Sequence, residues 1–118
     1  MQALTTEHCV ACRSDAPRLS ADELRDLLPQ IPQWEVAERD GIPRVTRSFK
    51  LRDFNDALEL TNRVGALAEA EGHHPAIVTE WGRVTVSWWT HKIRGLHRND
   101  VVMAAKTDEA AEDLAVQA

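Results

Sequence analysis

The chain has 118 residues, of which 43% are hydrophobic and 28% charged, and its formal net charge is −5. These values are ordinary for a soluble protein, so we expect one domain over residues 1–118 that needs no disulfide bonds for its core. The acidic balance argues against a protein that binds nucleic acid by neutralising phosphates. No apolar run approaches the roughly 18 residues of a membrane span, and the first residues show no signal-peptide pattern, which predicts a cytoplasmic protein without membrane contact.

An N-terminal arm is expected over residues 1–18, which show no periodicity. The arm contains Cys9 and Cys12 at C-x-x-C spacing. This spacing occurs in redox pairs and in halves of zinc sites, but a second pair is missing and only His8 adds a nearby ligand. Two reduced thiols in a mobile arm are therefore the favoured interpretation.

The first helix is predicted over residues 21–28. Ser20 and Glu23 have the spacing of a capping box, in which the side chain of each bonds the backbone N–H of the other. Pro29 ends the helix, because it has no backbone N–H and its ring clashes with the preceding turn.

A hairpin is predicted next. Residues 34–38 and 44–51 alternate between apolar and polar side chains, which is typical of half-buried strands. Asp40-Gly41 between them is a strong signal for a tight turn.

The longest helix is predicted over residues 54–71, with Asp53 as its N-cap and Gly72 at its end. Gly65 disfavours a helix by about 1 kcal/mol relative to Ala, so we expect it to permit a close approach to the sheet. The apolar stripe expected to face the core consists of Phe54, Leu58, Thr61, Val64 and Leu67.

The last predicted elements are a strand over residues 76–80, a turn at Trp81-Gly82, a strand over residues 83–90 and a helix over residues 98–115. Alternation in the second strand places Trp88 in the core and Trp89 on the face of His91, where it could border a ligand. We expect Trp81, at the turn, to pack against the rest of the structure.

The order helix, strand, strand, helix, strand, strand, helix predicts an α+β fold. We expect a two-layer sandwich, with a four-stranded antiparallel sheet and three helices packed on one face. An edge strand of so small a sheet can pair with a second subunit, so a homodimer or homotetramer is expected.

Three histidines, His73, His74 and His91, lie at the two ends of the second predicted hairpin. They can therefore converge on the rim of the sheet, with Glu69 one helical turn before His73 and Asp100 at the start of the last helix. Imidazoles titrate near neutral pH, so such a cluster indicates proton-transfer chemistry. Two alternatives remain at this point: solvated bystanders, or a catalytic zinc site with three histidine ligands.

The frame Glu69-x-x-x-His73-His74-Pro75, followed by Trp81, Thr90-His91, Gly95-Leu96 and Asp100, resembles the signature of the pterin-4a-carbinolamine dehydratases. The resemblance runs from about Ser20 to Ala111 and is greatest to bacterial members that accompany phenylalanine hydroxylase. The arm with the two cysteines is also similar to those members.

This resemblance implies a hydro-lyase that dehydrates 4a-hydroxytetrahydropterin to quinonoid dihydropterin, using no metal and no cofactor. That reaction recycles the pterin of an aromatic amino-acid hydroxylase, the implied functional partner. Because some family members act instead as non-enzymatic partners that stabilise the dimer of a transcription factor, a binding function is the alternative. A domain that only binds a metal ion is a third possibility.

The resemblance also implies site residues. His73 and His91 would transfer protons at the carbinolamine. His74 is expected as a third catalytic residue, which would hold and orient the pterin and share the role of the acid. The implied pocket lining is Pro75, Thr90, Lys92 and Ile93, with Glu69 and Asp100 as orienting residues behind the histidines. The chain departs from the family pattern at Gly72, where members can carry an acid, and at Ile77, where they can carry an aromatic residue.

Overall fold

The computed structural model describes residues 4–9 and 17–116. Within these residues the chain forms four strands, three α-helices and three short 3₁₀ segments. In chain order they are η1 (Leu4–Thr6), α1 (Ala21–Leu27), η2 (Leu28–Gln30), β1 (Glu35–Arg39), β2 (Ile42–Lys50), α2 (Phe54–Glu71), β3 (Ala76–Glu80), β4 (Arg83–Trp88), η3 (His91–Ile93) and α3 (Arg98–Ala111).

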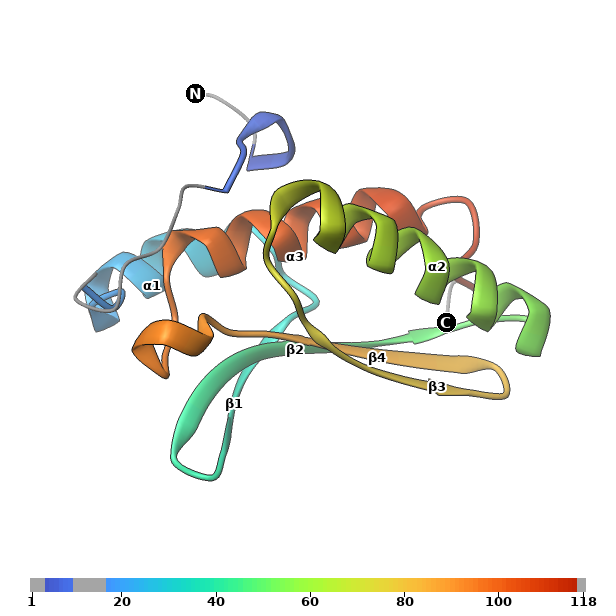
Figure 1. Ribbon diagram of the computed structural model, residues 1–118, viewed down its shortest axis with the longest axis horizontal. Coiled ribbons are helices and arrows are strands. Elements are labelled where there is room, and N and C mark those ends of the chain that lie inside the picture. Colours follow the sequence, from blue (N-terminus) through green and yellow to red (C-terminus); the bar gives the residue numbers. More distant parts are fainter. Residues whose placement is uncertain (1–3, 10–16, 117–118) are drawn as a thin grey trace.

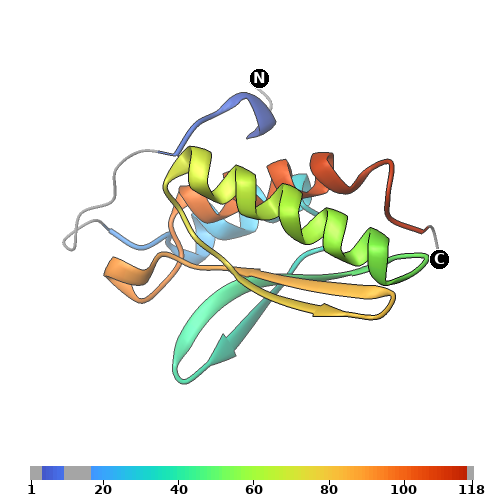
Figure 2. The same cartoon turned by 45° about the vertical axis from the view of Figure 1, so that its right-hand side comes forward.

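The strands form one antiparallel sheet in the order β1-β2-β4-β3. All three α-helices lie on one face of this sheet, as Figures 1 and 2 show from two directions. No helix of the described residues covers the other face. The predicted two-layer α+β fold is therefore confirmed.

Local signals in the sequence set most element boundaries. Ser20 and Glu23 form the predicted capping box. Asp53 accepts a hydrogen bond from the backbone of Asp56 at the start of α2, and Gly72 ends that helix in the left-handed conformation at φ 64°. At the first hairpin Asp40 and Gly41 both have positive φ, as a two-residue turn of this hand requires.

Several ends differ from the predictions. Strand β1 begins one residue later than expected, because Trp34 belongs to a turn that bonds back to Ile31. Strand β2 begins two residues earlier than expected, because Ile42 and Pro43 already pair with β1. Strand β4 ends at Trp88, since Thr90 leaves the ladder to pair with Gly95. Helix α3 ends at Ala111 and not at residue 115, because the chain there turns and continues toward β2.

The predicted core stripe of α2 is wrong. Phe54 and Leu58 are exposed, and of the five predicted residues only Val64 is fully buried. The helix is in contact with α3 as well as with β3 and β4, so the face that it buries differs from the stripe expected against the sheet alone. The buried residues of α2 are Ala57, Leu60, Val64 and Ala68.

Two single-residue expectations also fail. A Cβ atom added at Gly65 would meet nothing within 4 Å, so this glycine marks no close approach to the sheet. Trp81 does not pack into the structure, because 73% of it is exposed at the β3–β4 turn. Trp88, in contrast, is fully buried as predicted.

The described part of the arm, residues 4–9, folds against the helices. Leu4 is buried in the core, and η1 lies on the side of α2 and α3 that faces away from the sheet (Figure 1). The Cys9 side chain is half-buried, whereas Cys12 lies outside the described residues, so the interpretation of the pair stays a prediction. None of the described helices has the length and hydropathy of a membrane span.

Candidate active site

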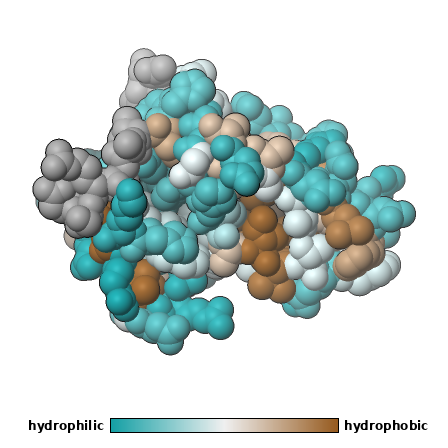
Figure 3. Space-filling view, viewed as in Figure 1, coloured by the Kyte–Doolittle hydropathy of each residue, from teal (hydrophilic) through white to brown (hydrophobic). Residues whose placement is uncertain are grey.

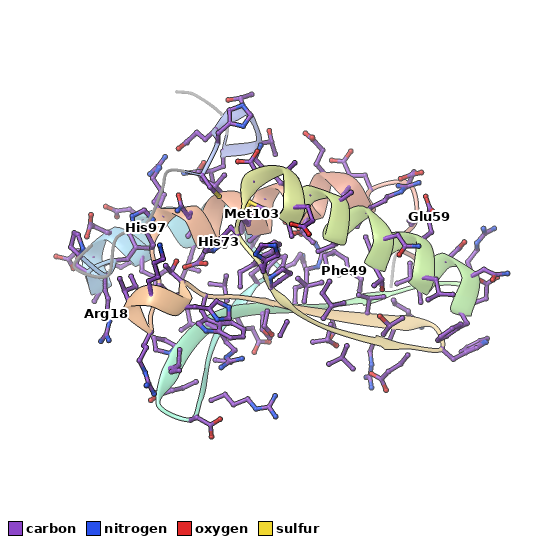
Figure 4. The ribbon with its side chains drawn as sticks, in the orientation of Figure 1. Arg18, Phe49, Glu59, His73, His97 and Met103 are labelled. Atoms are coloured by element: carbon purple, nitrogen blue, oxygen red, sulfur yellow. The ribbon has the colours of Figure 1, made fainter. Side chains whose placement is uncertain are left out.

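His73 is the buried member of the histidine trio. The left-handed turn at Gly72 reverses the chain after α2, and the His73 side chain then lies between the helical layer and the sheet (Figure 4). Its Nε2 is 2.6 Å from Oδ1 of Asp100, and its ring stacks on Trp88 at a centroid distance of 5.8 Å and an angle of 6°. The imidazole is therefore fixed in position and in orientation.

Asp100 is the centre of the buried network. It is fully buried at the third position of α3, where the positive end of the helix favours a carboxylate. Its Oδ2 accepts hydrogen bonds from Oγ1 of Thr90 at 2.8 Å and from the backbone N of His97 at 2.9 Å. Because a carboxylate can only accept, His73 donates from Nε2, which leaves Nδ1 as the nitrogen that can take a proton.

His91 and His74 form a second, exposed part of the site. Nε2 of His91 donates to the carbonyl oxygen of His74 at 3.3 Å, and the His91 ring stacks on Trp89 at 4.5 Å. Nε2 of His74 is 3.0 Å from Oε2 of Glu69, and both side chains are more than half exposed. Glu69 thus pairs with His74, whereas its spacing in the sequence indicated His73.

The loop that carries His91 is held by a residue that the sequence did not single out. Arg18 donates from Nε to the carbonyl of Ile93 at 2.8 Å, and its side chain lies against Gly95 (Figure 4). A Cβ at Gly95 would come within 2.8 Å of Arg18, so the glycine makes this contact possible. No short-range pattern joins residues 18 and 95, which explains why sequence reasoning missed the contact.

Arg44 is a second residue that the sequence did not indicate. It lies on β2 with its guanidinium 4.0 Å from the centre of the Trp89 ring, the same ring on which His91 stacks. The side chain is 9% exposed, and its Nε has no hydrogen-bond partner among the described residues. Arg44 therefore supports the indole that positions His91.

The other predicted pocket residues lie at different depths. Thr90 and Ile93 are buried, Pro75 is half-buried and Lys92 is exposed. Thr90 faces Asp100, so it acts on the histidine network from behind. Within residues 4–9 and 17–116, no three histidine, cysteine or carboxylate side chains are grouped so that they could hold a metal ion.

Comparison with known proteins decides the family. The sequence model described as pterin 4 alpha carbinolamine dehydratase matches residues 17–110. The chain belongs to this family. The expected resemblance is thereby confirmed over the whole region that contains the histidine frame.

Relatives agree with this assignment. A Gloeobacter violaceus protein is 63% identical over 92% of this chain and 93% of its own length, and one from Nitrosococcus oceani is 59% identical over 92% and 96%. Both are named, provisionally, as pterin-4-alpha-carbinolamine dehydratases. The chain is therefore an enzyme of the hydro-lyase class.

Solved structures confirm the fold. A Brucella melitensis protein described as a transcriptional coactivator/pterin dehydratase superposes with a TM-score of 0.74 at 33% identity, over 80% of this chain and 99% of that one. A pterin dehydratase-like protein described as a RuBisCO assembly factor of the alpha-carboxysome gives 0.57 at 19% identity, over 67% and 89%. The second likeness concerns the fold alone.

Proposed function

We propose that the protein dehydrates 4a-hydroxytetrahydropterin to quinonoid dihydropterin by histidine acid–base catalysis. The observation that carries the proposal concerns two imidazoles in a chain of the dehydratase family. His73 is buried and held by a carboxylate, and the exposed His91 bonds the backbone of His74, the residue that follows His73. Proton transfer needs groups that both give and take protons near neutral pH, which imidazoles do.

The reaction requires two proton transfers and no change of oxidation state. The C4a–O bond breaks as the leaving hydroxyl takes a proton and departs as water, while N5 loses its proton and forms a double bond to C4a. The lone pair of N5 supplies the electrons, so the bond rearrangement needs no metal or organic cofactor. His73 and His91 carry the two proton transfers, each contributing on the order of 10²–10⁴-fold.

The remaining residues position these two groups. Asp100, supported by Thr90, holds His73 with Nδ1 free to take a proton. His74, exposed beside His91, holds the pterin, with Pro75 and Lys92 at the edge of the site. Glu69 orients His74 through their contact at 3.0 Å.

We further propose that the protein serves an aromatic amino-acid hydroxylase, whose reaction releases the 4a-carbinolamine. The test is a working hydroxylase assay in which the transient carbinolamine absorbance is followed with and without this protein. Wild-type protein should speed the decay in proportion to its concentration. A decay that is unchanged at every concentration would remove the dehydratase proposal.

Self-assembly is part of the proposal. Strand β3 is an edge strand, and apolar side chains on it, on its turn and on α2 are 41–73% exposed: Phe54, Leu58, Val78 and Trp81. Figure 3 shows apolar surface in the region of α2 and the β3–β4 hairpin. Exposed apolar surface of this kind is typical of interaction sites. Light scattering should report a homodimer or homotetramer, which Trp81→Ser and Val78→Ser should weaken.

A further inference from the structure

The described part of the arm, residues 4–9, lies outside the residues matched by the family model. It nevertheless contacts both backbone segments that carry the buried pair of His73 and Asp100. His73 follows the end of α2, and Asp100 lies in the first turn of α3. The arm spans these two helix ends on the side away from the sheet (Figure 2). Its contacts with each end are therefore relevant to the geometry of His73 and Asp100.

At the end of α2 the arm binds Glu71, the last residue of the helix. Oε1 of Glu71 accepts from the backbone N of Cys9 at 2.7 Å, and Oε2 lies 2.9 Å from Nδ1 of His8. The Glu71 side chain is only 10% exposed. The hydrogen bonds from His8 and from Cys9 lower the pKa of Glu71, which favours the charged carboxylate that accepts them.

At the start of α3 the arm binds the two residues before Asp100. Arg98 donates from Nε and Nη2 to the two oxygens of Glu7 at 2.9 and 2.7 Å, a bidentate pair. The Cys9 thiol lies 4.0 Å from the carbonyl oxygen of Asn99. Further along the helix, Lys106 donates to the carbonyl of Thr5 at 3.0 Å.

Leu4 anchors this segment, because it is 3% exposed and belongs to the hydrophobic core. The arm is thus fixed at one end by burial and along its length by contacts with both helices. Only Gly72 separates Glu71 from His73, and Asn99 is the direct neighbour of Asp100. A shift of either helix end would change the 2.6 Å contact between His73 and Asp100.

We propose that residues 4–9, through Glu71 and Arg98, position the His73–Asp100 pair. This inference rests on the proposed function for its effect on rate, but its effect on geometry is independent of any activity. Glu71 and Arg98 are positioning residues, since their contacts reach His73 and Asp100 only through the backbone. A displacement of about 1 Å at a catalytic group lowers the rate by up to 10²-fold.

The test compares Glu71→Gln and Arg98→Gln with Glu59→Gln. Glu59 is the matched control, since it is an exposed carboxylate on the same helix that pairs with Arg63, far from the site (Figure 4). Glu71→Gln and Arg98→Gln should each lower kcat about five- to tenfold with an unchanged KM. Glu59→Gln should match wild type in both parameters.

Two readouts separate positioning from general loss of structure. Combined with His73→Ala, Glu71→Gln should cause no further loss of kcat, because both changes act through one imidazole. In ¹⁵N-edited NMR, Glu71→Gln should shift the ring nitrogen signals of His73 in a protein whose other core signals are unchanged.

The proposal is overturned if Glu71→Gln leaves the His73 ring signals at their wild-type positions, or if it lowers the activity of the His73→Ala variant by the same factor as that of wild type. A wild-type protein without dehydratase activity would remove the proposed function alone, because the NMR comparison still decides whether the arm positions His73.

Discussion

The two histidine environments of the site differ in almost every physical respect. His73 is buried, bonded to a fully buried carboxylate and stacked on a core tryptophan, whereas His91 is exposed and held by one carbonyl and one half-buried ring. Burial fixes the geometry of the first imidazole and ties it to the stability of the fold. Exposure leaves the second free to meet a ligand. Substitutions at the two positions should therefore separate stability from activity.

The largest effect is expected for His73→Ala. It should lower kcat by about 10²–10⁴-fold. It should also lower the free energy of unfolding by about 3 kcal/mol, because Asp100 loses the partner of its buried charge. Rapid-mixing kinetics and denaturant unfolding measure the two effects. A fully active variant with wild-type stability would show that the buried pair is incidental to both.

His91→Ala should have an effect on rate alone. We expect a loss of about 10²-fold or more in kcat, with the free energy of unfolding within about 0.5 kcal/mol of wild type, because the side chain is exposed. The same two measurements apply. If this variant unfolds as easily as His73→Ala, the distinction between a buried and an exposed imidazole does not hold.

Thr90→Val should have an intermediate effect. Removing the hydroxyl deprives Asp100 of one of its three hydrogen bonds, which should lower the free energy of unfolding by about 1–2 kcal/mol and kcat by a few-fold. Thr85→Val, on β4, is the matched control, because its hydroxyl bonds Ser48 at the surface. Equal stability losses in the two variants would contradict a special role for Thr90.

Glu71 links stability to pH at the buried end of the site. Its pKa is lower in the folded protein than in the unfolded chain, chiefly because of His8, so the unfolded state binds more protons as the pH falls. The advantage of wild type over Glu71→Gln, about 1 kcal/mol at neutral pH, should therefore persist above the ordinary pKa of a glutamate. This advantage should disappear as the pH falls through the lowered pKa that Glu71 has in the folded protein. Thermal unfolding between pH 3 and pH 7 measures this, and a constant difference would contradict it.

The smallest effect is expected for Glu69→Gln. Glu69 and His74 are exposed, so their contact should contribute less than about 0.5 kcal/mol to stability. We expect kcat to fall less than threefold. A loss as large as that of His73→Ala would mean that Glu69 acts on the chemistry directly.

The sequence predicted the ends of helices and turns better than it predicted which side chains pair. Local signals such as the capping box at Ser20, the turn at Asp40-Gly41 and the helix end at Gly72 depend on near neighbours, so they were predicted correctly. The pairing of Glu69 with His74 was not, because spacing along a helix cannot tell which of two consecutive histidines faces the same side.

Long-range contacts explain the remaining differences. Arg18 with Gly95 and Arg44 with Trp89 join residues far apart in the sequence, and no periodic pattern records such pairs. The core face of α2 was misjudged for the same reason. Its burial depends on where α3 lies, and Phe54 and Leu58 remain exposed although their spacing fits a core stripe.

The proposed function consists of one reaction, the dehydration of the 4a-carbinolamine, and of two imidazoles, those of His73 and His91. The most direct measurement is the decay of purified 4a-carbinolamine, followed by rapid mixing with equal amounts of wild type and of the double variant His73→Ala/His91→Ala. We predict fast, concentration-dependent decay with wild type and a rate close to the uncatalysed one with the double variant. Equal rates with the two proteins would contradict the assignment of the chemistry to His73 and His91.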